Sequence, residues 1–301
     1  MIIIYDVSMR MDFTGSQLSN VIYGGSEKKT GIIFANQKWM LKYRKKTIYG
    51  DAFNDVSEYL GSKIFALLGF QTQEVLLGTY NGQYVVACKD FISNNQFTPF
   101  NDVGESTIDE DKEKYQYSYE DIMKLLMANK KLTNVEETIS SFFDIYVVDA
   151  LLGNFDRHGA NWGFLKKNNK YILAPIFDNG SCLYPNLTNE DEMQIILNTE
   201  EEINNRIYKF PTSQIKLDGH KSSYYEVISS LKYKEVNEAL LRIYPRIDLD
   251  KIYKLIDDIS IISDIHKTFY KTMIKYRYEK IIKYSYERLK GILWEAMNQK
   301  E

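Results

Sequence analysis

The sequence is poor in cysteine, and it has no long apolar run. Its 301 residues include only two cysteines, Cys88 and Cys182, which stand far apart without a CxxC pair. Disulfide frameworks and structural zinc sites need more thiols at closer spacing, so we expect both cysteines to be reduced packing residues. No apolar stretch approaches the roughly 18 residues of a membrane span, and the opening MIIIYDVSMR lacks the features of a signal peptide. We therefore expect a cytoplasmic protein without a transmembrane segment; delivery elsewhere by a route that uses no N-terminal signal stays open.

An excess of charge of one sign is also lacking. The formal net charge is −3 and the pI is about 5.8, so nothing global attracts the chain to nucleic acid or to an anionic membrane. With 44% hydrophobic and 26% charged residues, the chain can bury a substantial core. Its length suits two medium lobes better than one compact domain.

The first hundred residues have the patterns of strands and turns around one helix. Three elements are predicted in order: a hairpin over residues 30–44, a helix over 54–68 and a second hairpin over 72–91. Asn54 or Asp55 is the expected helix cap, and Asn81-Gly82 is a strong signal for the second hairpin turn. Residues 1–92 are therefore predicted to form a β-rich N-lobe.

An acidic connector is predicted over residues 93–120. Residues 101–120 hold seven acids and two lysines with almost no aliphatic side chains, which is typical of a solvated segment. The pattern then turns helical, interrupted by a polar loop and by short strands over 161–180. The predicted fold class is α+β and bilobal, with the mostly helical C-lobe over 121–301.

The segment 267–290 is basic, with eight Lys or Arg residues against two Glu. The apolar and aromatic residues that recur within it at helical spacing are Tyr270, Ile274, Tyr278, Ile281, Ile282 and Leu289. An apolar stripe that faces the core, beside a solvated basic face, accounts for the pattern. A docking face for an acidic partner or for nucleic acid is the alternative.

The polar loop after the helix expected over 135–154 has the residue types of phosphoryl transfer. That reaction needs a carboxylate to accept a proton and oxygen ligands for Mg²⁺. Asp156 and Asn161 lie five residues apart, the spacing of base and metal ligand in the H-R-D-x-x-x-x-N loop of protein kinases. Asp178 follows seventeen residues later, where a hairpin would return it beside Asn161. We expect His158 to orient the loop, with assistance at the phosphate as the alternative; the role of Arg157 stays open.

The N-lobe supplies the other groups that a kinase needs. Gly24, Gly25 and Ser26 are predicted to form a turn whose backbone N–H groups suit phosphate. Lys42 stands on the next strand and Glu58 on the lobe's helix, so the two are predicted to form the ion pair that aims the lysine at phosphate. The run VVACKDF fits a hinge whose backbone meets adenine; its predicted nucleotide-binding residues are Ala87, Cys88, Lys89 and Asp90.

Several motifs resemble the HipA-like serine/threonine kinases. They are the loop Asp156-x-His158-x-x-Asn161, in which the histidine follows the aspartate, together with GGSEKKTGI, SEY at 57–59 and LAPIFDNG. The similarity spans roughly Tyr23 to Leu183. EVLLGTY, VACKDF and the chain length resemble the short, CtkA-type branch of the family most.

The resemblance implies ATP as phosphate donor, Mg²⁺ as cofactor and a protein Ser or Thr as acceptor. It implies Asp156 as base with Lys42 and His158 in the catalytic set, Asn161 and Asp178 as metal ligands, and Phe177 beside the nucleotide. Autophosphorylation at Ser19, Ser26 or Thr30 is a further expectation.

The region before Tyr23 is shorter than the extra subdomain of full-length HipA proteins would need, so the resemblance leaves open whether an antitoxin partner and a DNA-bound assembly exist here. Two other functions stay open. A lipid or small-molecule kinase is one, because phosphatidylinositol kinases also use D-R-H-x-x-N. A catalytically silent nucleotide-binding regulator is the other, although all the expected groups are retained.

Overall fold

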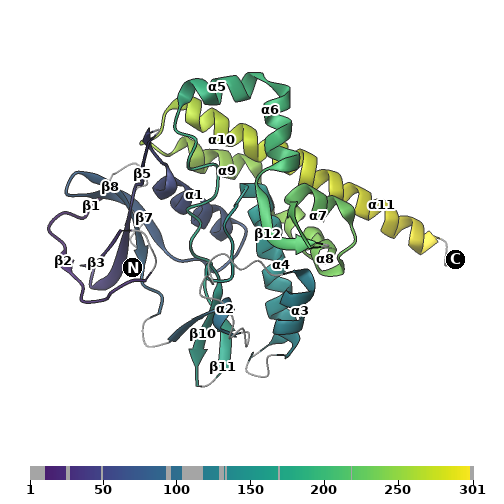
Figure 1. The fold of residues 1–301 in the computed structure, drawn as a ribbon, viewed down its shortest axis with the longest axis horizontal. Helices are drawn as coiled ribbons and strands as arrows, with labels where there is room; N and C mark the ends of the chain where they lie inside the picture. Colours follow the sequence, from purple (N-terminus) through teal and green to yellow (C-terminus); the bar gives the residue numbers. More distant parts are fainter. Residues whose placement is uncertain are drawn as a thin grey trace. The chain divides into compact units, whose positions relative to one another are not determined.

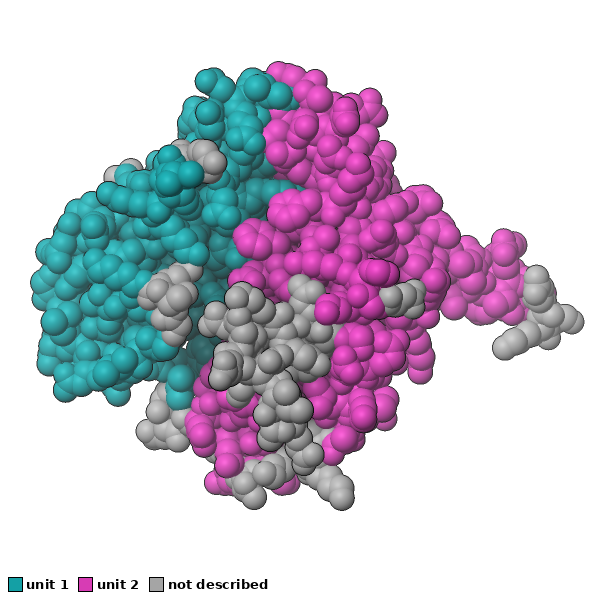
Figure 2. Space-filling model, in the orientation of Figure 1, with its two compact units in different colours: residues 1–94, 175–195, 249–271 teal, residues 95–174, 196–248, 272–301 magenta. Residues whose placement is uncertain are grey.

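The structure, a computed structural model, divides into two compact units that are each built from three stretches of chain (Figure 2). Unit 1 comprises residues 1–94, 175–195 and 249–271, and unit 2 comprises residues 95–174, 196–248 and 272–301. The described residues are 11–24, 28–48, 50–92, 96–103, 118–128, 132, 134–168, 170–217 and 219–298. Two segments from late in the sequence therefore complete the first unit.

Unit 1 contains a six-stranded sheet (Figure 1). Its strand order is β1 (Met11–Asp12), β7 (Val75–Tyr80), β8 (Gln83–Lys89), β4 (Gln37–Tyr43), β3 (Lys29–Phe34) and β2 (Gln17–Leu18). Both predicted hairpins are present. Asn81 and Gly82 have φ of 49° and 73°, the left-handed conformation of a two-residue turn.

Alternation along the strands gives the sheet two different faces. Leu41, Val85 and Ala87 belong to the apolar cluster on one face. Because side chains point to opposite faces at successive positions, Lys42 and its cross-strand partner Val86 lie on the other. Helix α1 (Asn54–Leu67) packs against β7 and β8.

The predicted cap of α1 is wrong. Its N-cap residue is Phe53, and no side chain caps the helix there. The Asn54 amide is used elsewhere: Oδ1 accepts from Lys45 N–H at 2.8 Å, and Nδ2 donates to Tyr43 O at 3.0 Å. The amide therefore ties the helix start to the end of β4.

The remaining elements of unit 1 are short strands and later helices. They are β5 (Lys46–Thr47), β6 (Gly50–Asp51), α9 (Leu249–Asp257), the start of α5 (Glu190–Asn198) and the start of α10 (Asp264–Arg277). α9 contacts α1.

Unit 2 has a three-stranded sheet and several helices. The sheet order is β11 (Lys170–Leu173), β10 (Gly163–Lys167) and β9 (Gln96–Pro99), and β12 (Thr212–Leu217) pairs with β13 (His220–Ser223). The helices are α2 (Phe100–Val103), α3 (Tyr119–Ala128), α4 (Val135–Leu152), α6 (Glu200–Asn204), α7 (Tyr224–Ser230), α8 (Lys234–Ile243) and α11 (Tyr284–Asn298). Two π-helical turns, η1 (Asn205–Lys209) and η3 (Tyr278–Lys283), and the 3₁₀ turn η2 (Tyr244–Arg246) complete it.

Helix α4 ends at the polar loop. Its N-cap Asn134 accepts a hydrogen bond from Glu137 N–H at 3.1 Å. Gly153 stops it in the left-handed conformation, with φ of 63°. Most of the predicted acidic connector, residues 104–117, lies outside the described residues, and β9 and α2 occupy 96–103.

Five members of the predicted apolar stripe in the basic segment are buried, namely Tyr270, Ile274, Ile281, Ile282 and Leu289. The sixth, Tyr278, is only half-buried. Arg277 is buried as well and donates to Ala150 O. Among the described residues, no helix combines the length and the apolarity that crossing a bilayer requires.

Candidate active site

Lys42 lies in the interior of unit 1, on β4, with only 7% of the residue exposed. Its Nζ is 2.7 Å from Glu58 Oε2 and 2.8 Å from Asp178 Oδ1. The predicted ion pair between Lys42 and Glu58 is therefore present, and Asp178 joins it from the late segment of the same unit.

The two carboxylates decide the charge of Lys42. Burial by itself lowers the pKa of the ammonium, but Asp178 and Glu58 outweigh burial and hold that pKa well above its usual value. Glu58 is fully enclosed, whereas the Asp178 side chain is 38% exposed. The group thus holds one cation and two carboxylates, and Asp178 is the member that solvent reaches.

Asn179 anchors the segment that carries Asp178, a contribution that the sequence prediction missed. Its backbone N–H donates to Glu58 Oε1 at 2.9 Å, and its Nδ2 donates to Ser62 Oγ at 2.9 Å. Gly61 leaves the necessary room, because a Cβ there would lie 2.6 Å from Asn179 Cβ. The signal in the sequence was the pair of small residues three and four positions after Glu58, on the same helix face.

A short parallel bridge holds the other end of that segment. Ile176 N–H donates to Gln71 O at 2.9 Å, and Gln73 N–H donates to Ile176 O at 2.8 Å. Asp178 itself has a φ of 58°, a left-handed conformation that is uncommon outside glycine but that aspartate and asparagine adopt more readily than other residues.

The predicted hinge begins inside the sheet. Ala87, Cys88 and Lys89 belong to β8, which pairs with β4 on one side and with β7 on the other. The Cys88 thiol is buried, and burial together with the charge of Glu58 raises its pKa. Cys88 is therefore a neutral residue next to the Lys42 group. Both cysteines are buried, as expected of packing residues.

Part of the hinge backbone is already in use. Lys89 N–H donates to Glu74 O at 2.9 Å, and Asp90 N–H donates to Lys38 O at 2.9 Å. Lys89 O accepts from Gln73 Nε2 at 2.9 Å. Because these backbone groups are already hydrogen-bonded, an adenine that binds to the predicted hinge has to use other backbone groups of the segment.

Phe177 packs against the end of the predicted hinge. Its ring centroid is 5.5 Å from that of Phe91. In the predicted phosphate turn, Gly24 is exposed and its carbonyl accepts from Lys29 Nζ. Gly25 and Ser26 lie outside the described residues.

In unit 2, a buried ion pair shapes the polar loop. Asp149, on the last turn of α4, accepts from Arg157 Nε at 2.9 Å and from Arg157 Nη2 at 3.0 Å. Asn154 Nδ2 donates to the same carboxylate at 2.8 Å. Arg157 Nη1 also donates to Asn161 O at 3.1 Å. Arg157, whose role the sequence left open, therefore closes the loop onto the helix that precedes it.

The predicted catalytic residues of unit 2 lie on this closed loop. Asn161 Nδ2 donates to Asp156 O at 2.7 Å, which leaves the Asn161 Oδ1 out of that bond. The Asp156 carboxylate remains 42% exposed. His158 Nδ1 accepts from Ala160 N–H at 3.2 Å, and its Nε2 is 3.8 Å from Asp156 Oδ1, too far for a hydrogen bond.

Gly159 is required where the loop passes α2. A Cβ on Gly159 would lie 2.0 Å from Asn101 Oδ1, and the Gly159 carbonyl accepts from Asn101 N–H at 3.1 Å. The structure thus gathers Asp156, His158 and Asn161 in unit 2 and Lys42, Glu58 and Asp178 in unit 1. The prediction that Asp178 returns beside Asn161 stays a prediction.

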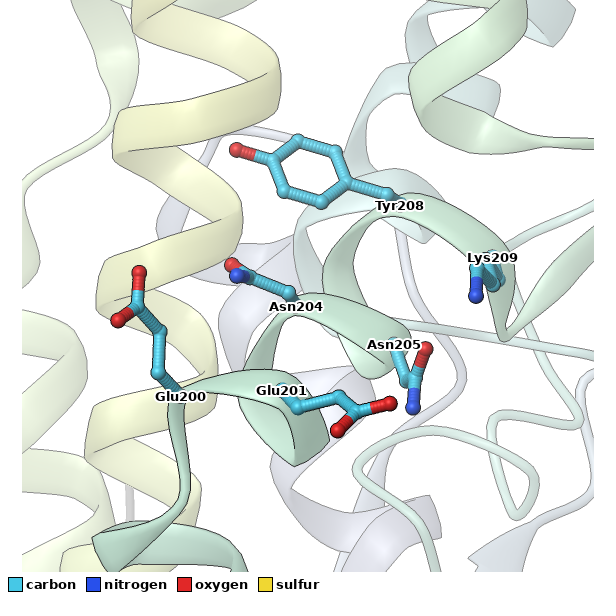
Figure 3. Close-up of a pocket in the computed structure, with 6 residues that line it drawn as sticks. All are labelled: Glu200, Glu201, Asn204, Asn205, Tyr208 and Lys209. Carbon is cyan, nitrogen blue, oxygen red and sulfur yellow. The ribbon is translucent and has the colours of Figure 1, made fainter.

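A surface hollow elsewhere in unit 2 contains none of these residues (Figure 3). Its lining residues are Glu200, Glu201, Asn204, Asn205, Tyr208 and Lys209. Two carboxylates against one ammonium would repel the phosphates of a nucleotide. The hollow is therefore a poor phosphate site.

Comparisons with known proteins identify the family of this chain. The model of the HipA-like C-terminal domain matches residues 21–243. The chain is 37% identical over 277 residues to the serine/threonine-protein kinase CtkA of Helicobacter pylori, which covers 89% of this chain and 85% of that protein. This chain belongs to the HipA-like family.

Solved structures of the family give the same result. The crystal structure of a Helicobacter pylori proinflammatory kinase CtkA matches with a TM-score of 0.84 and 35% identity, covering 94% of this chain and 99% of that one. A chain of the Shewanella oneidensis complex of HipA, HipB and operator DNA shares the fold, with a TM-score of 0.54 and 15% identity over 95% of this chain and 69% of that one. The predicted bilobal, kinase-like α+β fold is confirmed, and the protein is an enzyme of the serine/threonine-protein kinase class.

Proposed function

We propose that the protein transfers the γ-phosphate of ATP, bound with Mg²⁺, to a Ser or Thr hydroxyl of a protein. The observation that carries the proposal is the buried group of Lys42, Glu58 and Asp178. Glu58 holds the ammonium of Lys42 in one place, and a fixed cation stabilises the charge that develops on transferring phosphoryl oxygens.

The donor atoms of the chain suit Mg²⁺, the ion that neutralises phosphate charge when it is bound. Mg²⁺ prefers oxygen ligands and is usually held by one or two carboxylates together with phosphates and water. In our proposal Asp178 contributes its exposed carboxylate and Asn161 contributes Oδ1.

Asp156 is the proposed base for the acceptor hydroxyl. Its side chain is solvent-accessible, while its backbone carbonyl is fixed by Asn161. The hydrogen bond from Ala160 N–H to His158 supports an orienting role for the histidine in the loop. Asp156 therefore has the access that a protein substrate requires.

Autophosphorylation near the phosphate turn is the finer part of the proposal. Thr30 Oγ1 and Tyr43 Oη are hydrogen-bonded at 2.8 Å, and Ser19 Oγ accepts from Val21 N–H at 3.3 Å. A phosphate on Thr30 or Ser19 removes the hydroxyl proton and adds about −1.5 to −2 charge beside the turn, which should lower nucleotide affinity. Phosphopeptide mapping after incubation with ATP and Mg²⁺ tests this part, and modification only outside Ser19, Ser26 and Thr30 would exclude it.

The main test uses labelled ATP with the purified protein and a cell lysate. We expect label on protein Ser or Thr, and we expect Asp156→Asn to reduce transfer by about a hundredfold or more, because it removes the proton acceptor at nearly constant size. Asp250→Asn, a change of the same chemistry on an exposed turn of α9, is the control and should transfer like the parent protein. Label found only in a lipid extract would favour a lipid kinase, and no label at all would favour a silent regulator.

A further inference from the structure

Lys42 is not the only cation that joins β4 to α1. Arg44 follows the last residue of β4, and its backbone N–H still pairs with Tyr84 O at 3.0 Å. Its guanidinium makes a forked ion pair with Asp55: Nε lies 2.9 Å from Oδ1, and Nη2 lies 2.9 Å from Oδ2. Asp55 stands one helical turn before Glu58.

The spacing of the four residues along the chain places the two ion pairs next to each other. Residues two apart on a strand point to the same side, as Lys42 and Arg44 do, and residues three apart on a helix share a face, as Asp55 and Glu58 do. The pairs therefore connect the same strand to the same helix at successive positions. A forked pair also fixes orientation, which the single ammonium of Lys42 cannot do.

The second pair is enclosed by aromatic rings. Asp55 is fully buried, and burial raises the pKa of its carboxyl group, an effect that Arg44 opposes. The Arg44 guanidinium carbon lies 4.3 Å from the ring centroid of Tyr84 and 4.7 Å from that of Phe53. Arginine suits such a stacked, bidentate position and lysine does not.

The segment 249–271 of unit 1 also contacts the start of α1. Phe53 is the N-cap residue of α1, and its ring meets His266 of α10 edge-on at 4.2 Å between centroids. His266 in turn contacts Tyr270 at 4.7 Å. The first turn of α1 is thus held from β4 through Asp55 and from α10 through Phe53.

We propose that Arg44 and Asp55 are positioning residues that set the rotation of α1 on β4, so that Glu58 meets Lys42. This inference rests on the proposed function, in which Lys42 aligns phosphate. Arg44 and Asp55 act only through the helix. Loss of their ion pair leaves Lys42 and Glu58 in the chain but loosens the contact between them.

The chemical reactivity of Lys42 measures that contact without any assay of transfer. The nucleotide-free protein is treated briefly with an amine-reactive N-hydroxysuccinimide ester, and modification at Lys42 is quantified by peptide mass spectrometry relative to exposed Lys234. In Asp55→Asn we expect Lys42 to react about tenfold faster than in the parent protein, equivalent to ~1.4 kcal/mol of lost stabilisation. Arg44→Lys, which keeps the charge but loses the fork, should give an intermediate rate.

A matched control separates positioning from general loss of stability. In unit 2, Arg242 Nη2 and Asp144 Oδ1 form another ion pair at 2.8 Å, with Asp144 buried. Asp144→Asn should lower the unfolding midpoint as Asp55→Asn does, and it should leave the reactivity of Lys42 unchanged. An equal increase at Lys42 in both variants would overturn the proposal.

A second variant covers the case in which Asp55→Asn does not fold. Arg44→Met combined with Asp55→Leu replaces the ion pair with apolar side chains, a change that buried pairs often tolerate. Reactivity of Lys42 at the parent rate in any of the folded variants would overturn the positioning role. ATP with Mg²⁺ should separately protect Lys42 in the parent protein; absence of protection would count against the proposed function, because the positioning test uses only the nucleotide-free rates.

Discussion

Each unit contains a buried pairing of a cation with carboxylate, and the two pairings are used differently. In unit 1, Lys42 is itself the proposed phosphate ligand, and one of its partners, Asp178, is open to solvent. In unit 2, Arg157 and Asp149 are both buried, and the proposed base Asp156 stands outside their pair. In unit 1, the charge that is proposed to bind phosphate therefore lies in the core. In unit 2, the buried ion pair instead fixes the loop that carries the exposed Asp156 carboxylate.

The first prediction breaks the pair that only shapes the loop. Asp149→Asn leaves the Arg157 guanidinium buried without a counter-charge, so we expect the free energy of unfolding to fall by about 3–5 kcal/mol. Urea denaturation measures the loss, with Asp191→Asn on α5 as an exposed control that should change it by less than ~0.5 kcal/mol. Equal stability of the parent protein and Asp149→Asn would mean that the loop does not depend on this pair.

The second prediction breaks the pair that contains the functional group. Lys42→Met should reduce phosphate transfer by about a hundredfold or more, because a preorganised cation is lost from the developing charge. Lys271→Met removes one charge from an exposed pair with Asp257 in the same unit, and it should transfer normally. Equal transfer by the two variants would remove Lys42 from the site.

The third prediction compares two buried bases of unit 1. Carboxylates raise the pKa of Lys42, whereas burial and the neighbouring Arg44 lower the pKa of His266 to about 4. Because this pKa is depressed on folding, His266 contributes stability that is complete above about pH 6.5 and is lost as the pH falls towards about 4. Between pH 7 and pH 5, the His266→Phe variant should therefore lose about 2 kcal/mol less stability than the parent protein loses.

Denaturation curves at pH 7 and pH 5 for the parent protein and for His266→Phe provide the measurement. His220, which is exposed on β13, gives the control variant His220→Phe, whose acid sensitivity should match that of the parent. If His266→Phe loses as much stability as the parent between the two pH values, His266 is not the group that titrates.

The fourth prediction concerns an exposed pair and has the smallest effect. Lys283 Nζ and Glu287 Oε1 are 3.9 Å apart, and both side chains are about half exposed. Lys283→Ala should change the free energy of unfolding by no more than ~0.5 kcal/mol, because solvent screens such pairs. A loss comparable to that of Asp149→Asn would erase the distinction between buried and exposed pairs.

Local patterns predicted the parts of the fold that depend on local physics. Asn81-Gly82 forms its turn because both residues accept a left-handed backbone. Lys42 and Glu58 could be paired from sequence, since a lysine on a strand and a glutamate on the next helix match the ion pair of protein kinases.

Contacts that no helix or strand pattern specifies could not be predicted in the same way. Arg157 has many acids within reach in the sequence, and only the fold selects Asp149. The cap of α1 was wrong because a tertiary partner, the end of β4, takes the Asn54 amide that local rules assign to the helix. Nothing in the sequence pattern indicates that residues 249–271 pack with the first 94 residues, which places His266 against Phe53.

Calorimetric titration of ATP, with and without Mg²⁺, tests the central claim most directly. In that claim the carboxylate that binds Mg²⁺-ATP, Asp178, and the carboxylate that accepts the proton, Asp156, are different residues with separate roles. Asp156→Asn should bind Mg²⁺-ATP like the parent protein, since Asp156 is assigned to the acceptor hydroxyl. Asp178→Asn should lose the Mg²⁺-dependent part of the affinity, since it lacks the negative metal ligand. Equal Mg²⁺ dependence in the two variants, or none in the parent protein, would contradict the account.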